Sequence, residues 1–477
     1  MKFVLPLVSA ALLFAAPSAV AEPAGSAGEA LDLDRVIAMA IERNAGFRAE
    51  QARRAEVEGA VVETAADAWP QIEVVSGWNR SRNPSLLNSP DFDDILEQFP
   101  DFEPGEQELW NLGVTVEQPI WSGGKVQAAL DLAKLVVDVT DAQIETARLD
   151  LALEAATLYY DWLRAERAIV TLEAQRLARQ ASLDVVEARY ELDDATELER
   201  LRAVASLAEV APAVANAEGN RRVAASRLRA LLGLAPGVVV LLLDPADDDA
   251  PAEPPALAVL MPLAAIHRSE LRELDLQLDA FSRQRETTVA DRRPQIDLTG
   301  AYGHQVRLLD DLGDSLFADW RIGIGMSWSV FDGGRIRGEV AQIDAQRDQA
   351  KWRLEELRRQ VVAELEAGRA AWATARERLA AAQLASNAAT EAARVAAESF
   401  RLGVALQADL LDAQDRAVAQ ELAAIEARYD LLLEDARLRR AVGLQPDDPF
   451  TDPPDPTSPD SEPAPAELDA PEEGPNP

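Results

Sequence analysis

The amino-acid sequence contains an internal duplication that covers most of the chain. Three pairs of segments match at an offset of 210: residues 110–114 with 320–324, 121–125 with 331–335, and 228–234 with 438–444. Upstream the offset becomes 224, where Pro-Gln-Ile at 70–72 matches Pro-Gln-Ile at 294–296. The 14 extra residues of the first copy therefore lie within 81–109. Because one offset holds over more than a hundred residues, chance matching is excluded and the fold must contain two similar halves.

Each copy has the same predicted order of elements: a half-length helix, two strands, a long helix and a return helix. The first copy, 22–235, is expected to hold a half helix 31–68, strands 71–80 and 110–120, a long helix 125–192 and a return helix 196–232. The second copy, 256–445, is expected to hold a half helix 256–292, strands 295–305 and 320–330, a long helix 335–402 and a return helix 406–442.

The lengths of these helices predict how they pack. A long helix of 68 residues spans roughly 100 Å, and a return helix stacked end to end on a half helix spans roughly 110 Å. Each copy should therefore build one full-length strut and two half-length ones. A seven-residue apolar frame, beginning at Leu151 and Val361, indicates coiled-coil packing. Arg176 and Arg179 interrupt the frame in the first copy.

The four predicted strands alternate apolar and polar residues and have aromatic residues near their ends. In the fourth, one face would hold Trp320, Ile322, Ile324, Met326 and Trp328. This length and period are typical of strands that cross a bilayer, although a single such segment would suit a water-soluble hairpin equally well. Four matched segments behind a secretory signal favour the membrane. Since four strands cannot close a barrel, several chains would share one, and the residues alone permit two chains or more.

The segments outside the two copies have distinct compositions. Residues 1–21 are expected to be a cleaved signal peptide, with Lys2, a short apolar stretch and a small-residue cleavage site. The apolar stretch is too short for a membrane anchor. Residues 236–255 form a crossover, interpreted as a belt at mid-length around the helices. The tail 446–477 is acidic and rich in proline, and is expected to be disordered.

Composition excludes several classes of function. A net charge of −36 repels nucleic acid. The chain has no cysteine and only two histidines, His267 and His304, which lack metal-ligand spacing. No nucleophile–base set, phosphate-binding loop or metal cluster is evident, so we expect no catalytic residue, no metal and no cofactor. The chain is therefore not expected to be an enzyme.

With these features, the chain resembles the outer membrane efflux protein family, the TolC-type exit ducts, over about residues 31–444. The resemblance depends on the duplication, the strand pairs and the Gly-Gly turns at Gly123, Gly124, Gly333 and Gly334. It also depends on Phe400-Arg401-Leu402-Gly403, which is followed by Asp409-Leu410-Leu411-Asp412. Lacking a cysteine after its signal, the chain looks like the non-lipidated branch.

The resemblance implies a fold that is mainly α with membrane β. A homotrimer would form a 12-stranded β-barrel in the outer membrane lipid, four strands per chain. The barrel would continue into a long periplasmic α-helical coiled-coil barrel. The implied partners are a periplasmic adaptor (membrane fusion) protein and an inner-membrane pump of the RND or ABC type. The duct would passively conduct drugs or, in type I secretion, proteins.

Asp409 and Asp412 are the candidate gate and selectivity residues. They are three residues apart, hence on one helical face, and in a trimer they would form two rings of carboxylates that favour cations. The resemblance matches them to the constriction aspartates of the family, and Glu199 is the equivalent of Asp409 in the first copy. Alternatively, they supply favourable charge in the first turns of a helix. A well-known member of the family has a tyrosine at the position of Phe400 and an arginine at the position of Ala405. These two residues therefore cannot form the tyrosine hydrogen bond or the arginine–carboxylate pair that would lock the closed state.

The tips of the two long hairpins are the candidate contacts with the adaptor. The resemblance points to Leu402, Gly403 and Val404 in the second copy and to Leu192, Asp193 and Asp194 in the first. Gly403 suits a turn with positive φ, and Asp tolerates such a turn better than most residues. Each tip also suits an ordinary helix-hairpin turn.

Two other classes of function compete with a passive outer membrane duct. A periplasmic adaptor or coiled-coil scaffold would also be secreted and rich in helical hairpins, but it would need a globular lipoyl-like or β-barrel region that the sequence lacks. An enzyme on a helical scaffold lacks a chemical site. The cargo and the identity of the adaptor and pump stay open.

Overall fold

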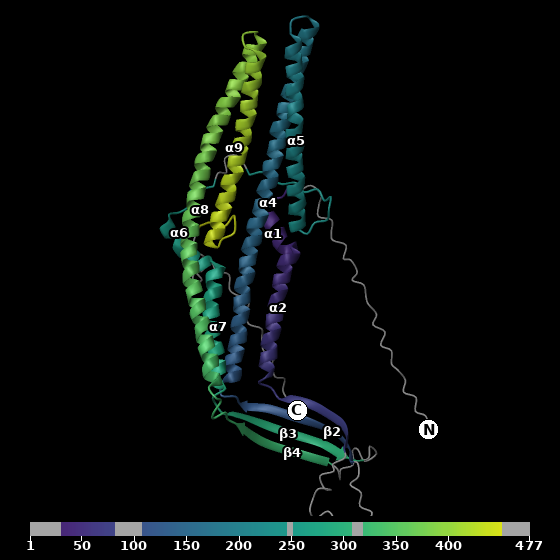
Figure 1. Ribbon diagram of the computed structural model, residues 1–477, viewed down its shortest axis with the longest axis vertical. Helices are drawn as coiled ribbons and strands as arrows, with labels where there is room; N and C mark the ends of the chain where they lie inside the picture. The colour runs from purple at the N-terminus through teal and green to yellow at the C-terminus, as the bar shows by residue number, and fades with distance from the viewer. Residues whose placement is uncertain (1–29, 82–106, 246–250, 308–317, 451–477) are drawn as a thin grey trace, which may run out of the picture.

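The computed structural model of the protein describes residues 30–81, 107–245, 251–307 and 318–450. These residues form a long, narrow molecule, mainly helical, with a four-stranded antiparallel sheet at one end and two helical hairpin tips at the other (Figure 1). The expected signal peptide and residues 451–477 of the expected tail lie outside the described residues.

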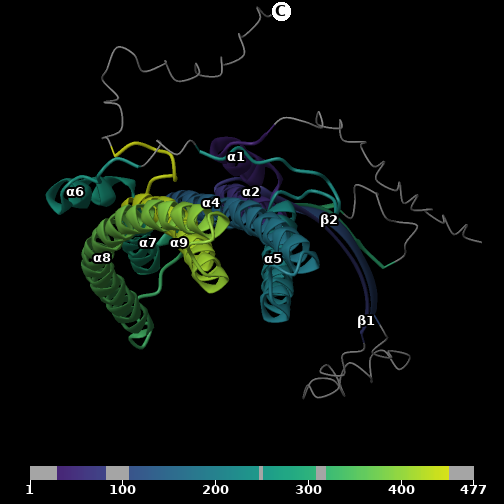
Figure 2. The ribbon, with the colours of Figure 1, turned by 90° about the horizontal axis from the view of Figure 1, so that it is seen from above.

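Both halves of the chain contain the same order of elements. The first half holds α1 (Leu33–Arg43), α2 (Ala45–Ala66), β1 (Gln71–Ser81), β2 (Gln107–Trp121), α4 (Lys125–Glu191) and α5 (Glu197–Leu231). The second half holds α6 (Leu257–His267), α7 (Ser269–Ala290), β3 (Gln295–Val306), β4 (Ala318–Ser327), α8 (Arg335–Arg401) and α9 (Gln407–Val442). Seen from above, α8, α9, α4 and α5 follow an arc, and α1 and α6 lie on its outer side (Figure 2).

The sheet has the order β1-β2-β3-β4, so that β1 and β4 are its edges within the described residues. Its register pairs apolar residues across all four strands, as in the row Val74, Val114, Tyr302 and Trp320. Because side chains alternate along a strand, one face of the sheet is apolar and the other is polar. The apolar face is exposed in the single chain.

The fourth strand is shorter than the sequence predicted. It ends at Ser327, so Trp328 is not part of the apolar row. The indole Nε1 of Trp328 instead donates a hydrogen bond to the carbonyl of Arg292, 3.0 Å away, just beyond α7. This contact holds the chain beside the end of a helix rather than beside β3.

The prediction of one continuous half helix in each copy was wrong. The chain breaks at Asn44 (ψ 121°) and at Arg268 (ψ 110°), which are 224 residues apart. The side-chain oxygen of Asn44 accepts a hydrogen bond from the backbone of Phe47 (3.0 Å), which starts α2 as a new helix. The side-chain nitrogen of Asn44 donates to the carbonyl of Leu231 (3.1 Å), the last residue of α5. The return helix therefore ends against the break.

The break changes which helices stack along the long struts. α4 and α8 have 67 residues each, or roughly 100 Å. α5 stacks on α2, and these helices have 35 and 22 residues, or roughly 85 Å together. α1 and α6 do not extend the stack, contrary to the predicted 110 Å. They lie at mid-height (Figure 1), on the outer side of the arc (Figure 2).

The turns between strand and long helix use glycine in both halves. Gly123, Gly124, Gly333 and Gly334 all have φ between 65° and 91°, the left-handed region that favours glycine. At the second turn, Asp332 accepts hydrogen bonds from the backbone of Gly334 (2.8 Å) and of Ile336 (2.9 Å). In each half the long helix begins directly after the second glycine of the turn.

The largest buried cluster lies at mid-height, around α1, the centre of α4 and the start of the crossover. Leu31 pairs with the crossover in two backbone hydrogen bonds of 2.8 Å, to Leu241 and from Leu243. Tyr159 donates to the carbonyl of Leu243, and Tyr429 donates to the carboxylate of Asp244 (2.9 Å). Residues 237–245 are thereby fixed across the outer side of the helices. Residues 246–250 of the predicted crossover lie outside the described residues.

We expect Gly443→Ala to destabilise the protein by about 3 kcal/mol. Gly443 ends α9 with φ 96°, and a Cβ there would lie 2.6 Å from the backbone carbon of His267 at the second break. Gly334→Ala is the control, because its φ of 91° is similar and a Cβ there meets nothing within 4 Å. It should cost about 1–2 kcal/mol. Denaturant unfolding in detergent measures both, and equal losses would contradict close packing at the break.

Candidate gate and partner-contact tip

The two helical hairpins turn in the same way at the end of the molecule far from the sheet. Gly403 has φ 72°, and Asp193, at the matched position, has φ 54°. The backbone N–H of Val404 donates to the carbonyl of Ser399 (2.9 Å), and that of Asp194 donates to Arg189 (2.8 Å). Both are the usual left-handed ends of a helix. Asp193 is the only residue other than glycine with positive φ within the described ranges.

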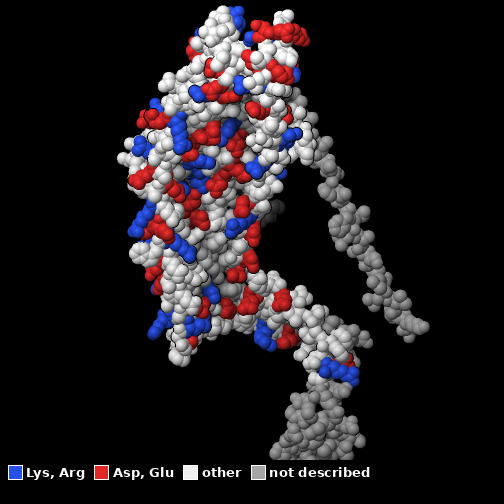
Figure 3. Space-filling view, turned by 45° about the horizontal axis from the view of Figure 1, so that its top comes forward, with Lys and Arg blue, Asp and Glu red and all other residues white. Residues whose placement is uncertain are grey.

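The tips expose apolar side chains together with acidic ones. Leu192 is 79% exposed and Val404 is 82% exposed, and Leu402 and Leu406 are also largely exposed. Acidic side chains gather at one of the tips in Figure 3, whereas the surface over the sheet is largely uncharged in that view. Exposed apolar groups rimmed by charge are typical of a surface that binds another protein.

Asp409 and Asp412 lie on the exposed side of the first two turns of α9. Leu410, between them, is buried, so the two carboxylates share the opposite face. Asp409 accepts a hydrogen bond from the backbone of Leu406 (3.3 Å), and Asp412 forms an ion pair with Arg416 (3.0 Å). Asp409 is therefore an acid in the first turn of the helix, as the alternative interpretation describes, and it also accepts a hydrogen bond there. Both residues are exposed.

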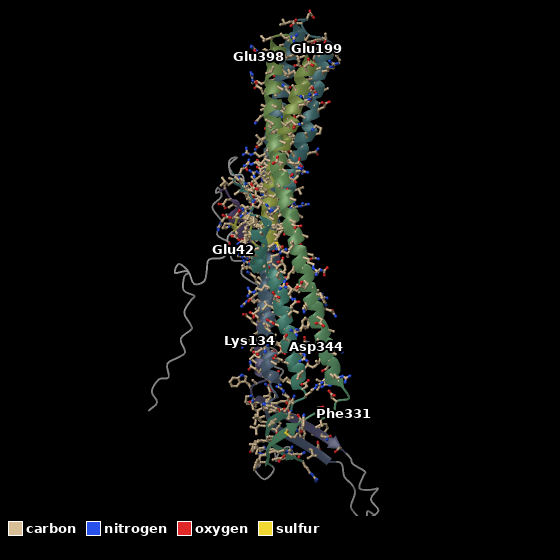
Figure 4. The ribbon with its side chains drawn as sticks, turned by 90° about the vertical axis from the view of Figure 1, so that its left-hand side faces the viewer. Glu42, Lys134, Glu199, Phe331, Asp344 and Glu398 are labelled. Carbon is tan, nitrogen blue, oxygen red and sulfur yellow. The ribbon has the colours of Figure 1, made fainter. Side chains whose placement is uncertain are left out.

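The carboxylate of Glu199 has a structural partner that the sequence interpretation did not include. It accepts hydrogen bonds from the backbone (2.7 Å) and the hydroxyl (2.9 Å) of Thr196, at the start of α5. The backbone hydrogen bond from Thr196 is the main cause that lowers the pKa of Glu199, so the group is charged. Glu199 and Glu398 lie at the same end of the molecule (Figure 4).

Two contacts join the hairpins at their tips. The buried side chain of Gln407, in α9, donates to the backbone carbonyl of Glu199, 3.1 Å away. The guanidinium of Arg189, in α4, lies 5.8 Å from the ring centroid of Phe400, in α8. A cation over an aromatic face is attracted to it. Phe400 thus takes part in a contact between hairpins although it has no hydroxyl group.

The sequence interpretation treated Arg179 only as an interruption of the apolar frame and missed its role. Its side chain is only 1% exposed. The guanidinium donates to Gln414 Oε1 (2.9 Å) and to the carbonyl of Leu411 (3.2 Å), and it pairs with Asp415. The charge that interrupts the apolar frame of α4 therefore binds α9 one turn beyond the candidate gate. No local signal identifies this role, because its partners are more than 230 residues away.

Among the described residues, no group of three or more histidine, aspartate or glutamate side chains is placed to hold a metal ion. His267 and His304 are on α6 and β3, in separate parts of the fold. Among the described helices, none has a stretch long and apolar enough to cross a membrane.

Comparison with known proteins gives a family match over both copies. The sequence model described as Outer membrane efflux protein matches residues 36–234 and 260–444. Outer membrane protein OprJ of Pseudomonas aeruginosa is 25% identical over 431 residues, which cover 86% of this chain and 84% of OprJ. Outer membrane protein TolC of Vibrio cholerae is 23% identical over 451 residues, which cover 93% of this chain and 96% of TolC.

A solved structure has the same fold. The crystal structure of the outer membrane protein VceC from Vibrio cholerae superposes with a TM-score of 0.70 at 20% sequence identity. The superposition covers 86% of this chain and 96% of VceC. The long struts, the hairpin tips and the four-stranded sheet therefore belong to a known architecture.

We expect Arg179→Met to loosen α9 next to the candidate gate residues Asp409 and Asp412. The loss of hydrogen bonds to a buried cation should cost about 2 kcal/mol. Arg176→Met is the matched control, since Arg176 is exposed and forms its ion pair with Glu173, three residues earlier on the same helix. It should change stability by less than about 0.5 kcal/mol. Hydrogen exchange at residues 411–416 should accelerate in the first variant alone, and unchanged exchange there would contradict the role.

Proposed function

The chain belongs to the outer membrane efflux protein family, and from that premise we propose that it is an outer membrane exit duct. Three copies would share one barrel of 12 strands, and their helices would continue it into the periplasm. The duct carries substrates passively, and its energy comes from partner proteins. It contributes no catalytic step.

The observation that carries this proposal is the four-stranded sheet with one apolar face and two edges. β1 and β4 each leave one side of their backbone without a strand partner in the described chain. In lipid, unpaired backbone groups are costly, so a sheet with open edges has to close. β4 of one copy pairing with β1 of the next closes it. The apolar face then meets lipid and the polar face lines the lumen.

The exposed tips support a partner at the opposite end of the molecule. Leu402, Gly403 and Val404 would contact a periplasmic adaptor, together with Leu192 and the acidic pair that follows it. The apolar side chains among them are largely exposed in the single chain, which is typical of a surface that binds another protein. The adaptor would connect the duct to an inner-membrane pump of the RND or ABC type. Drug efflux and type I protein secretion are both compatible with this arrangement.

Asp409 and Asp412 are proposed as the selectivity gate. Their exposure on one face of α9 supports this role, because two rings of three carboxylates would favour cations at the inner end of the duct. Glu199 would add negative charge nearby while its carboxylate caps α5. Phe400 would steady the tip through Arg189.

The native mass of the protein, extracted by mild detergent from isolated outer membranes, tests the shared barrel. We expect three copies in each particle, because four strands per chain give a barrel only when chains combine. A single chain, recovered in the soluble fraction, would contradict the proposal and favour the scaffold function.

The double variant Asp409→Asn and Asp412→Asn tests the gate. Asparagine keeps a helix-capping side chain and removes the charge, so the fold should be retained. The ratio of cation to anion permeability in a planar bilayer should fall toward one. Glu398→Gln is the control, since Glu398 is an exposed acid near the same tip, paired with Arg401. A ratio that stays unchanged in the double variant, or falls equally in the control, would overturn the assignment.

A further inference from the structure

The short helix α6 is apolar on both its buried and its exposed side. Leu260, Leu263 and Ala264 are buried against the region where α8 and α9 meet. On the other side, Val259, Met261 and Ile266 are exposed, and Ile266 is 60% exposed. A helix that is apolar all round is normally buried. The exposed side of α6 therefore indicates a surface that another group covers.

The matched helix in the first half does not have this property. α1 and α6 have the same length, and each ends at a break in the chain. At the matched offset of 224, α1 has Arg35 and Glu42 where α6 has Val259 and Ile266. Arg35 and Glu42 are exposed, and Glu42 lies on the outer side at mid-height (Figure 4). Two of the three exposed apolar positions of α6 are thus charged in α1, whereas the third, Met261, is matched to Ile37, which is apolar and buried.

The sequence and the fold offer three candidates for the group that buries the exposed face of α6. The residues from 451 onward contain one large apolar side chain, Leu468, and eight acidic ones, so they are unsuited to an apolar face. Lipid at the sheet is too far away, because the 22 residues of α7 separate α6 from β3 by roughly 33 Å. The third is a second copy of the chain, and it has a suitable surface.

That surface is the start of the crossover, residues 237–243, which is a run of valine and leucine after Gly237. Val240 is buried against the helices, whereas its neighbours Val239 and Leu241 point the other way and are exposed. Val239 is 81% exposed. The segment crosses the outer side of α4 and α5, where it lines a pocket with Trp162 and Arg229. Its outward row is an apolar edge with no cover in the described chain.

The two apolar surfaces lie at similar heights on opposite lateral sides of the molecule. In Figure 1, α6 lies at the left margin of the helices, and the crossover leaves α5 at the right margin. Two different surfaces on opposite sides generate a ring when the rotation between copies closes. This arrangement suits a molecule whose long helices already follow an arc (Figure 2).

We propose that the exposed face of α6 binds residues 237–243 of a second copy of the chain, head to tail around the ring. The inference rests on the proposed function, because it assigns a contact between copies of the shared barrel. It adds a joint at mid-height, separate from the strand pairing at one end and from the tips at the other. The burial of Ile266 and Val239 in this joint would strengthen the assembly in water.

Cross-linking tests the joint directly, because the chain has no native cysteine. The double variant Val239→Cys and Ile266→Cys is treated in isolated outer membranes with a short bismaleimide. We expect covalent species of two and three chains on a denaturing gel. Two single variants expressed together should stop at two chains, since each chain then carries one cysteine. Each single variant expressed alone should give one chain.

The control pair is Val62→Cys with Ile266→Cys. Val62 is 71% exposed on α2 and lies 18 residues beyond the break at Asn44, roughly 27 Å below it. This pair should not cross-link. If the native mass shows three copies and the Val239 pair links no better than the control, the joint is wrong and the duct stands. If the native mass shows one chain, the proposed function itself fails. Linkage of Ile266→Cys to another protein instead would also overturn the joint.

Charged substitutions on the two surfaces give a second test of the joint. Ile266→Glu should lower the temperature at which the particle separates into single chains, because a carboxylate would then face valine and leucine. Adding Val239→Lys should restore part of the loss. Ile266→Glu without any effect on that temperature would contradict the joint.

Discussion

The arrangement of this molecule depends on how two half-length helices meet along each long one. α4 and α8 are too long to be covered by a single return helix, so a second helix has to continue the cover toward the sheet. The junction is tight. Gly443 leaves no room for a side chain against the backbone of His267, and Asn44 binds the last carbonyl of α5. Once these junctions are fixed, the tips and the sheet lie at opposite ends, and α1 and α6 are directed to the outer side.

Much of this fold could be predicted because it is repeated and periodic. The alternation of side chains identified four strands, and the long apolar frames identified α4 and α8. The breaks could not be predicted from the pattern. Asn44 has a local capping signal, but Arg268 has none, and its side chain instead reaches Glu364 on α8 (2.6 Å). A break of this kind depends on what packs against it, here the end of α9.

The candidate gate shows the same limit at the level of single residues. Asp409 and Asp412 could be found from their spacing, and Gly403 from its need for a left-handed turn. Arg179 could not, because a charge in an apolar frame is usually a solvated interruption. The two halves also differ here, since Ala389 is matched to Arg179 and Arg202 is matched to Asp412. The paired carboxylates therefore occur on α9 alone, and the buried arginine that binds α9 comes from the other half.

A duplicated chain makes such differences informative, because each position in one half can be compared with the matched position in the other half. Where the fold position is the same, the backbone geometry is also the same, so an exposed position that changes from charged to apolar points to a different neighbour. Arg35 and Val259 differ in this way, as do Glu42 and Ile266. A ring built head to tail requires that the two lateral sides of a copy be complementary rather than alike. This requirement predicts that α6 and α1 differ on their exposed faces, as they do. The apolar face of α6 lies on the side of the molecule opposite the apolar crossover.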